Sequence, residues 1–64
     1  MKLNGKQFKL SDEVSILDFL KERNYSADRV AVELNGSIVP KREFEKTTLK
    51  DDDEVEIVCF VGGG

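Results

Sequence analysis

Histidine is absent from this sequence, and Cys59 is its only cysteine. Without histidine, the chain cannot perform histidine-based acid–base catalysis, form a Ser-His-Asp triad or bind a metal through imidazole. One cysteine cannot form an internal disulfide and is too few for a cysteine-based zinc site. A lone cysteine is typical of a reducing compartment rather than of a disulfide-rich secreted domain, so we expect a cytoplasmic protein.

Long apolar runs and basic stripes are also missing. No segment approaches the roughly 18 apolar residues of a membrane-spanning helix, and the residues after Met1 alternate in polarity, so we expect no targeting segment and no membrane association. The net charge of −3 disfavours a nucleic-acid partner. It is typical of a soluble cytosolic domain and, as a second reading, of a surface that docks on a basic partner.

Phosphate-binding loops of the GxxxxGK(S/T) and GxGxxG kinds are absent as well, and the glycines fall in two turns and at the C-terminus. Because no catalytic constellation is present, the sequence favours a carrier, a binding module or a protein modifier over an enzyme, and we expect no bound cofactor. The length of 64 residues allows one domain. A domain of this size buries only about 60% of its unfolded surface.

Two Asn-Gly pairs predict hairpins, at Asn4-Gly5 and Asn35-Gly36, because both central residues of a type I′ turn need positive φ. Pro40 ends the second hairpin or places its last strand at a sheet edge. The final strand is the most apolar, so we expect it in the middle of a sheet with both faces at least partly covered. The predicted strands cover residues 1–3, 6–10, 30–34, 37–39 and 55–61.

One helix is predicted over residues 15–24. Ser15 is a candidate N-cap, with Asp18 three residues later approximating a capping box. Asn24 is of a residue type that ends helices in the left-handed conformation. Two to three turns are not stable alone in water, so the helix must pack on a sheet. Its predicted apolar stripe comprises Ile16, Leu17 and Leu20.

The order of these elements predicts the fold. The last strand would lie between the two hairpins and pair in parallel with the first strand, with the helix as the crossover. The connection 41–50 should add Phe44 and Leu49 to the core. The acidic run 51–54 is interpreted as a solvated turn rather than a calcium site, because it lacks the spaced ligands of an EF-hand loop. The sequence therefore predicts an α+β β-grasp over residues 1–61, with four to five strands in a mixed sheet and one principal helix.

Residues 62–64 form a tail of three glycines after the last strand. A frayed terminus or an expression remnant is the simplest interpretation of such residues. A backbone without side chains is nevertheless thin enough to enter a narrow tunnel in a partner and to present its terminal carboxylate there. We therefore expect the working part of the protein to be this tail rather than a pocket in the domain.

The whole chain resembles the ThiS family, the ubiquitin-like sulfur carriers of thiamin biosynthesis. The features that carry the resemblance are the β-grasp order, Asn35-Gly36 followed by Val39-Pro40, the stretch 49–55 with its acidic turn, and the ending Val61-Gly62-Gly63-Gly64. Three alternatives stay open. They are the small subunit of molybdopterin synthase, a ubiquitin-like protein modifier, and an interaction module whose glycines have no role.

The resemblance implies a chemical role for Gly64. A ThiF-like adenylating enzyme would use ATP and magnesium to adenylate its carboxylate. A persulfide donor would then convert the adenylate into a thiocarboxylate, which donates its sulfur to thiazole synthase. Gly62 and Gly63 would be recognised as part of the tail. The family does not require Cys59, and we expect the free carrier to be a monomer that is a co-substrate rather than an enzyme.

A docking face is predicted on the last strand. If Val55, Ile57 and Cys59 face the helix, the alternate residues face the other side of the sheet, which a single helix leaves uncovered. The predicted docking residues are Ala31, Val58, Phe60 and Val61. Ordinary packing beneath the connection 41–50 is the alternative.

Overall fold

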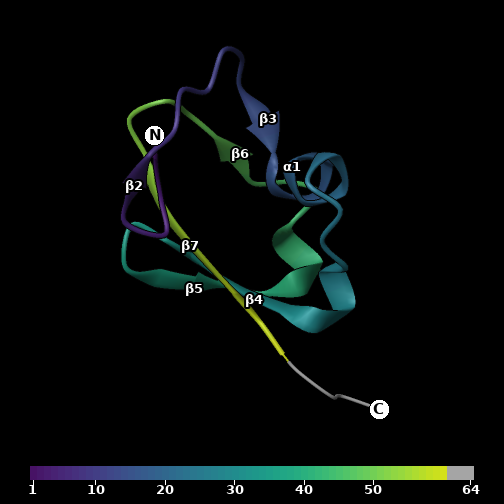
Figure 1. Cartoon of the computed structure of the whole chain (residues 1–64). Helices are drawn as coiled ribbons and strands as arrows, with labels where there is room; N and C mark the ends of the chain where they lie inside the picture. The colour runs from purple at the N-terminus through teal and green to yellow at the C-terminus, as the bar shows by residue number, and fades with distance from the viewer. Residues whose placement is uncertain (61–64) are drawn as a thin grey trace.

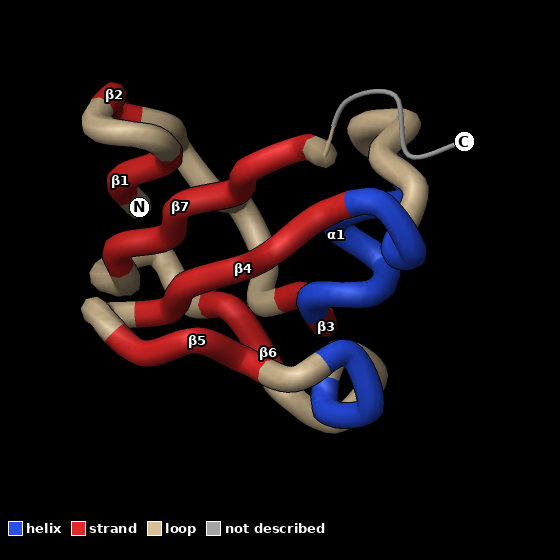
Figure 2. The backbone as a smooth tube through the Cα atoms, turned by 90° about the horizontal axis from the view of Figure 1, so that it is seen from below, coloured by secondary structure: helices blue, strands red, loops and turns tan. Residues whose placement is uncertain are grey.

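A five-stranded mixed sheet carries one helix on one face, as described over residues 1–60 of a computed structural model. The strands lie in the order β2-β1-β7-β4-β5, with α1 beside the sheet (Figures 1 and 2). The predicted α+β, ubiquitin-like β-grasp is confirmed. The elements of this layer are β1 (Lys2–Leu3), β2 (Lys6–Gln7), β4 (Val30–Leu34), β5 (Ser37–Val39), β7 (Glu54–Cys59) and α1 (Ile16–Glu22). Val61 and the glycines 62–64 lie outside the described residues.

The last strand, β7, occupies the centre of the sheet. It pairs in parallel with β1, where Lys2 lies opposite Glu54, and antiparallel with β4 over five residue pairs. Both Asn-Gly pairs have positive φ at each residue, 51° and 81° in the first hairpin and 52° and 87° in the second. The central position of β7, its parallel pairing and the turn conformations are therefore confirmed. Strand β5 is an edge strand that ends before Pro40, as predicted.

Helix α1 begins and ends as its sequence predicts. The Ser15 hydroxyl accepts a hydrogen bond of 3.1 Å from the backbone N–H of Asp18. Asn24 has a φ of 63°, which ends the helix in the left-handed region. The predicted apolar stripe was partly wrong. Phe19 is 2% exposed and lies beside Ile16 and Leu20 in the core, whereas Leu17 is only half-buried.

The connection between β5 and β7 lies on the helix side of the sheet. Phe44 (2% exposed) and Leu49 (0%) are buried there, which confirms their predicted place in the core. Two short elements were not predicted: β3 (Val14–Ser15) and β6 (Thr48–Leu49) form a separate antiparallel pair. Single 3₁₀ turns, η1 (Ala27–Arg29) and η2 (Lys41–Glu43), precede β4 and follow β5. The core comprises Met1, Ile16, Phe19, Leu20, Val30, Val32, Phe44, Leu49, Val55 and Ile57.

The acidic turn before β7 holds the N-terminal segments in place. Asp51 Oδ1 accepts hydrogen bonds from the Leu10 N–H (2.9 Å) and from the N-terminal ammonium of Met1 (3.0 Å). These interactions, the Leu10 bond foremost, hold the pKa of the Asp51 carboxyl below its usual value. Asp53 Oδ2 accepts from the Lys50 N–H at 2.9 Å. Within residues 1–60, no group of three or more potential ligands is placed to hold a metal ion.

The helices of this domain are short. The longest, α1, has 7 residues, and no helix in residues 1–60 is both long and apolar enough to cross a membrane.

Candidate functional site

Strand β7 leads from the centre of the sheet directly toward the predicted glycine tail (Figure 1). The backbone remains anchored just beyond the strand, because the Phe60 N–H donates a 2.8 Å hydrogen bond to the Arg29 carbonyl. The predicted tail residues Gly62, Gly63 and Gly64, and the predicted docking residue Val61, lie outside the described residues. The structure thus fixes the position of Phe60, the last described residue before the predicted tail.

The side of the sheet opposite α1 is an open face. On β7, Val55 (0% exposed) and Ile57 (6%) are buried in the core, whereas Val58 and Phe60 are each 56% exposed. Ala31 lies directly opposite Val58 on β4. The predicted docking residues Ala31, Val58 and Phe60 are therefore brought together on the outer side of the sheet. The prediction that both faces of β7 are at least partly covered was wrong for this side, where the outward residues of β7 are exposed.

The connection 41–50 does not cover this outer face. It hydrogen-bonds to the helix side instead, where the N–H groups of Ile16 and Leu17 donate to the carbonyls of Thr47 (2.9 Å) and Phe44 (3.0 Å). The alternative reading of the outer face as ordinary packing beneath that connection is therefore wrong.

Cys59 lies on the predicted side of β7 but is not buried there. It lies opposite Val30 on β4, on the side of the core, yet it is exposed. Strand β1 pairs with β7 only as far as Val55, so Cys59 has a neighbouring strand on one side only. Its thiol is a free, exposed group rather than part of the core under α1.

Ile38 also lies on this open side of the sheet, and sequence reasoning missed it. It is 72% exposed, more than any other large apolar side chain within residues 1–60. It lies opposite Glu33, which itself lies opposite Glu56. The two-residue turn at Asn35-Gly36 was the available signal, because such a turn sets the register of its hairpin and hence the partner of Ile38.

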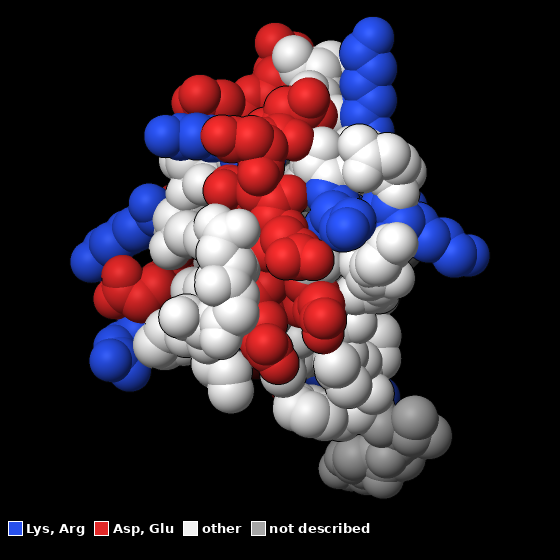
Figure 3. All heavy atoms as spheres, turned by 90° about the vertical axis from the view of Figure 1, so that its left-hand side faces the viewer, with Lys and Arg blue, Asp and Glu red and all other residues white. Residues whose placement is uncertain are grey.

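Acidic side chains share this outer side of the molecule. Figure 3 looks onto the side away from α1 and shows Asp and Glu atoms in a continuous band, with uncharged atoms and Lys and Arg side chains along its flanks. Strand alternation and register assign Glu33 and Glu56 to the same face as Val58 and Ile38. We call the set Ala31, Glu33, Ile38, Glu56, Val58 and Phe60 the outer face.

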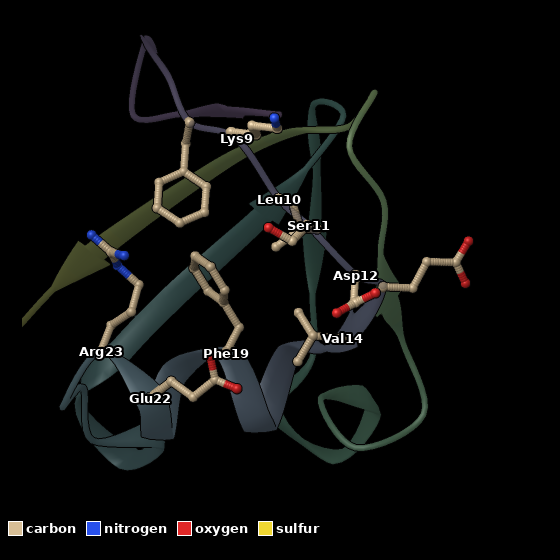
Figure 4. Close-up of a pocket in the computed structure, with 10 residues that line it drawn as sticks. Lys9, Leu10, Ser11, Asp12, Val14, Phe19, Glu22 and Arg23 are labelled. Carbon is tan, nitrogen blue, oxygen red and sulfur yellow. The ribbon is translucent and has the colours of Figure 1, made fainter.

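A cleft of about 390 Å³ lies on the other side of the molecule, between α1 and the segment that follows β2 (Figure 4). The rings of Phe8 and Phe19 meet edge to face there, with centroids 5.7 Å apart. The Arg23 guanidinium lies over both rings, at 4.8 and 5.5 Å from their centroids. Of the predicted site residues that the structure describes, none lines this cleft. We therefore assign the cleft to packing between α1 and the N-terminal hairpin.

A β-grasp domain whose central strand runs into a glycine tail beside an exposed apolar face belongs to the class of ubiquitin-like carrier domains. The model of the ThiS family matches residues 1–64, the full length. The chain belongs to the ThiS family.

Individual relatives agree with this assignment. The sulfur carrier protein ThiS of Bacillus subtilis (strain 168) is 40% identical over 65 residues, covering all of this chain and 98% of the relative. A thiazole synthase of Paramagnetospirillum magneticum (strain ATCC 700264 / AMB-1) is 37% identical over 62 residues, which are 97% of this chain and 19% of that protein. The crystal structure of a thiamine biosynthesis protein (ThiS) from Geobacter metallireducens superposes with a TM-score of 0.83 at 35% identity, covering 98% of this chain and 96% of that one.

Proposed function

We propose that this chain is a sulfur carrier of thiamin biosynthesis that holds the transferred sulfur as a thiocarboxylate on Gly64. The observation that carries the proposal is the match to the ThiS family across residues 1–64, which includes the glycine tail. The carrier-sized relative from Bacillus subtilis, aligned over its own near-complete length, supports it further. In this role the chain is a co-substrate of other enzymes and not itself a catalyst.

The chemistry takes place at the tail. A carboxylate is a poor electrophile, so a ThiF-like partner joins the Gly64 carboxylate to the α-phosphate of ATP with magnesium, and pyrophosphate leaves. A hydrosulfide equivalent, delivered by a persulfide donor and a reducing thiol, then displaces AMP and leaves the thiocarboxylate. The carrier supplies neither acid nor base to these steps. It supplies an unbranched end, whose Gly62 and Gly63 fit a tunnel too narrow for side chains.

The folded domain that precedes the tail provides the surface by which a partner binds the carrier. The Phe60 N–H is hydrogen-bonded to Arg29, so the chain is anchored up to the residue before Val61. Beside that exit, Ala31, Val58 and Phe60 offer apolar surface that a partner can cover. We propose that these residues and Val61 dock on the adenylating enzyme, which thereby positions the tail in its active site.

Thiazole synthase is the proposed recipient of the sulfur. The thiazole synthase of Paramagnetospirillum magneticum contains a segment that resembles this chain and makes up 19% of its length. A carrier-like segment and a synthase within one polypeptide are held at high local concentration. This arrangement supports a direct transfer from a ThiS-family carrier to a thiazole synthase for the present chain as well.

Intact-mass measurement tests the proposed function. The purified chain is incubated with a ThiF-like enzyme, ATP, magnesium, a persulfide donor and a reducing thiol. We expect a mass increase that equals the replacement of one oxygen by sulfur, located by fragmentation to Gly64. A chain lacking Gly63 and Gly64 is the control and should gain no mass. Covalent conjugates to lysines of other proteins, without a thiocarboxylate, would contradict the proposal and favour a protein modifier.

A further inference from the structure

Two carboxylates lie directly opposite each other on the outer face. Glu33 on β4 pairs with Glu56 on β7 in antiparallel register. Like charges at such directly opposed positions are unfavourable, because the two side chains project from the same face of the sheet at close range. Neither carboxylate takes part in an ion pair within residues 1–60. Local features that act against stability are expected at functional sites.

Apolar side chains border this pair. Ile38 is directly opposite Glu33, and Val58 follows Glu56 on the same face of β7. These side chains are 72% and 56% exposed, and Phe60 is also 56% exposed. The three are the large apolar residues that residues 1–60 leave exposed. Exposed apolar side chains gathered on one face, rather than scattered singly, mark an interaction surface.

The charge on the outer face selects its occupant. A second copy of this chain would set the Glu33–Glu56 pair mainly against acidic residues, because none of the six outer-face residues is basic. Lys2, which β1 adds to this side of the sheet, lies opposite Glu54. Nucleic acids and anionic membranes are repelled for the same reason. A protein surface with an apolar recess and flanking Arg or Lys side chains is complementary to this face in both respects.

The location of the outer face identifies the protein that binds it. Phe60 immediately precedes the segment that leads to Gly64, and its backbone is fixed to Arg29. A protein that encloses the tail therefore comes close to Phe60, whose exposed side chain belongs to the outer face. Resting on the proposed function, we infer that the adenylating enzyme binds the outer face through an apolar recess flanked by basic side chains. Glu33 and Glu56 together determine recognition by attracting those basic side chains.

Charge reversal at both positions separates recognition from folding. In Glu33→Lys with Glu56→Lys, the opposed side chains still carry like charges, so the cross-strand repulsion of the native pair is retained. The matched control is Glu13→Lys with Glu45→Lys, which makes the same change in net charge at exposed positions outside the outer face. The single variant Glu56→Lys turns the pair into one of opposite charges and should unfold at no lower temperature than the native chain.

The assay is ATP–pyrophosphate exchange by a ThiF-like enzyme at increasing concentrations of carrier. For the outer-face double variant, we expect the half-saturating carrier concentration to rise about tenfold or more, with the maximal rate unchanged because the tail is intact. The control double variant should stay within about twofold of the native chain, since distant exposed charges are largely screened. Raising the salt concentration should weaken the binding of the native chain and of the control to the enzyme more than the binding of the outer-face variant.

The possible outcomes are distinguishable. Exchange that depends on native carrier, together with an outer-face variant indistinguishable from the control, would overturn the docking inference and leave the proposed function standing. No exchange with the native carrier would overturn the proposed function and the inference with it. Sedimentation of the native chain as a dimer that charge reversal at Glu33 alone strengthens would assign the outer face to a second copy, and would overturn the inference.

Discussion

At the scale of single residues, the two turn asparagines each perform two tasks. Asn4 and Asn35 supply the positive φ of their hairpin turns, and their side chains also bind the backbone of β7. The Oδ1 atom of Asn4 accepts from the Ile57 N–H at 2.7 Å, and that of Asn35 accepts from the Glu54 N–H at 2.9 Å. Strand β7 is therefore held on both sides by turn side chains in addition to its neighbouring strands.

The contribution of Asn4 can be measured by substitution. Asn4→Gly keeps the positive φ accessible but removes the acceptor for Ile57, so we expect the free energy of unfolding to fall by about 1 kcal/mol. Asn4→Asp keeps an acceptor oxygen and should lose less. Urea titration of the three proteins provides the measurement. Equal stability of Asn4→Gly and the native chain would show that water replaces the side-chain bond without loss.

Asp51 predicts a dependence of stability on pH. Its folded pKa lies below its unfolded value, chiefly because the Leu10 N–H bonds to the ionised form and next because of the Met1 ammonium. The unfolded chain therefore binds the proton more readily in this range. The stabilisation is complete above the unfolded pKa of about 4 and disappears as the pH falls through the folded pKa.

Thermal unfolding of Asp51→Asn tests this dependence. The variant cannot ionise at this position, so the difference in melting temperature between it and the native chain should shrink as the pH is lowered from about 6 to about 2. Both proteins should also lose stability from their other carboxylates, which makes the difference the informative quantity. A difference that stays constant over the whole range would contradict the assigned role of Asp51.

At the scale of elements, the face that α1 buries decides which helix substitutions matter. Leu20 is 0% exposed, so Leu20→Ala should lower the free energy of unfolding by about 2–5 kcal/mol through an unfilled cavity. Leu17 is half-buried, and Leu17→Ala is the matched control with a clearly smaller loss expected. Denaturant titration compares the two. Similar losses for both variants would mean that the helix presents a wider face to the core.

Elements with a strong local signal were predictable from the sequence, and elements without one were not. Ser15, Asn24 and the Asn-Gly pairs have local roles that hold in most contexts, so the helix ends and both hairpins were confirmed. The strands β3 and β6 have two residues each, too few for any periodicity, and exist because their segments meet in the fold. Phe19 was missed because the stripe was assigned from adjacent apolar residues instead of the i, i+3, i+4 spacing.

Some features of the candidate site could likewise be predicted from the sequence, and others could not. Alternation along β4 and β7 indicates which residues share a face, so Ala31 and Val58 were correctly placed on one face. The openness of that face depends on where the connection 41–50 lies, which no local pattern indicates. The pairing of Glu33 with Glu56 is likewise a long-range relation between β4 and β7. The acidic part of the outer face therefore became visible only in the structure.

At the scale of the whole molecule, the tail should be separable from the fold. Within residues 1–60, the last core residue along the chain is Ile57, and glycine has no side chain to bury, so deletion of Gly63 and Gly64 should not change the free energy of unfolding. Adenylation should be abolished, because the carboxylate retreats by up to about 7 Å along an extended chain. A misplacement of about 1 Å can already lower a positioned reaction by about 100-fold.

Pyrophosphate exchange and thermal unfolding of the truncated chain check this prediction together. Gly64→Val is a second variant of native length, in which a β-branched side chain would have to enter the proposed tunnel of the partner, and it should be nearly as inactive. Near-normal exchange by the truncated chain would show that the C-terminus is not the working part. A large fall in melting temperature would show instead that the tail is part of the folded domain.

The parallel pairing of β1 with β7 has a mechanical consequence. The first and last strands start at the same end of the sheet, so the N-terminus and the exit of β7 lie at opposite ends of the molecule (Figure 1). Force applied between these ends loads the β1–β7 hydrogen bonds in shear, all at once, instead of opening them one by one. An unfolding enzyme that pulls on the C-terminus must first extract β7 from between β1 and β4. The end that we propose enzymes to bind is thus also the end at which unfolding must break two sets of strand hydrogen bonds.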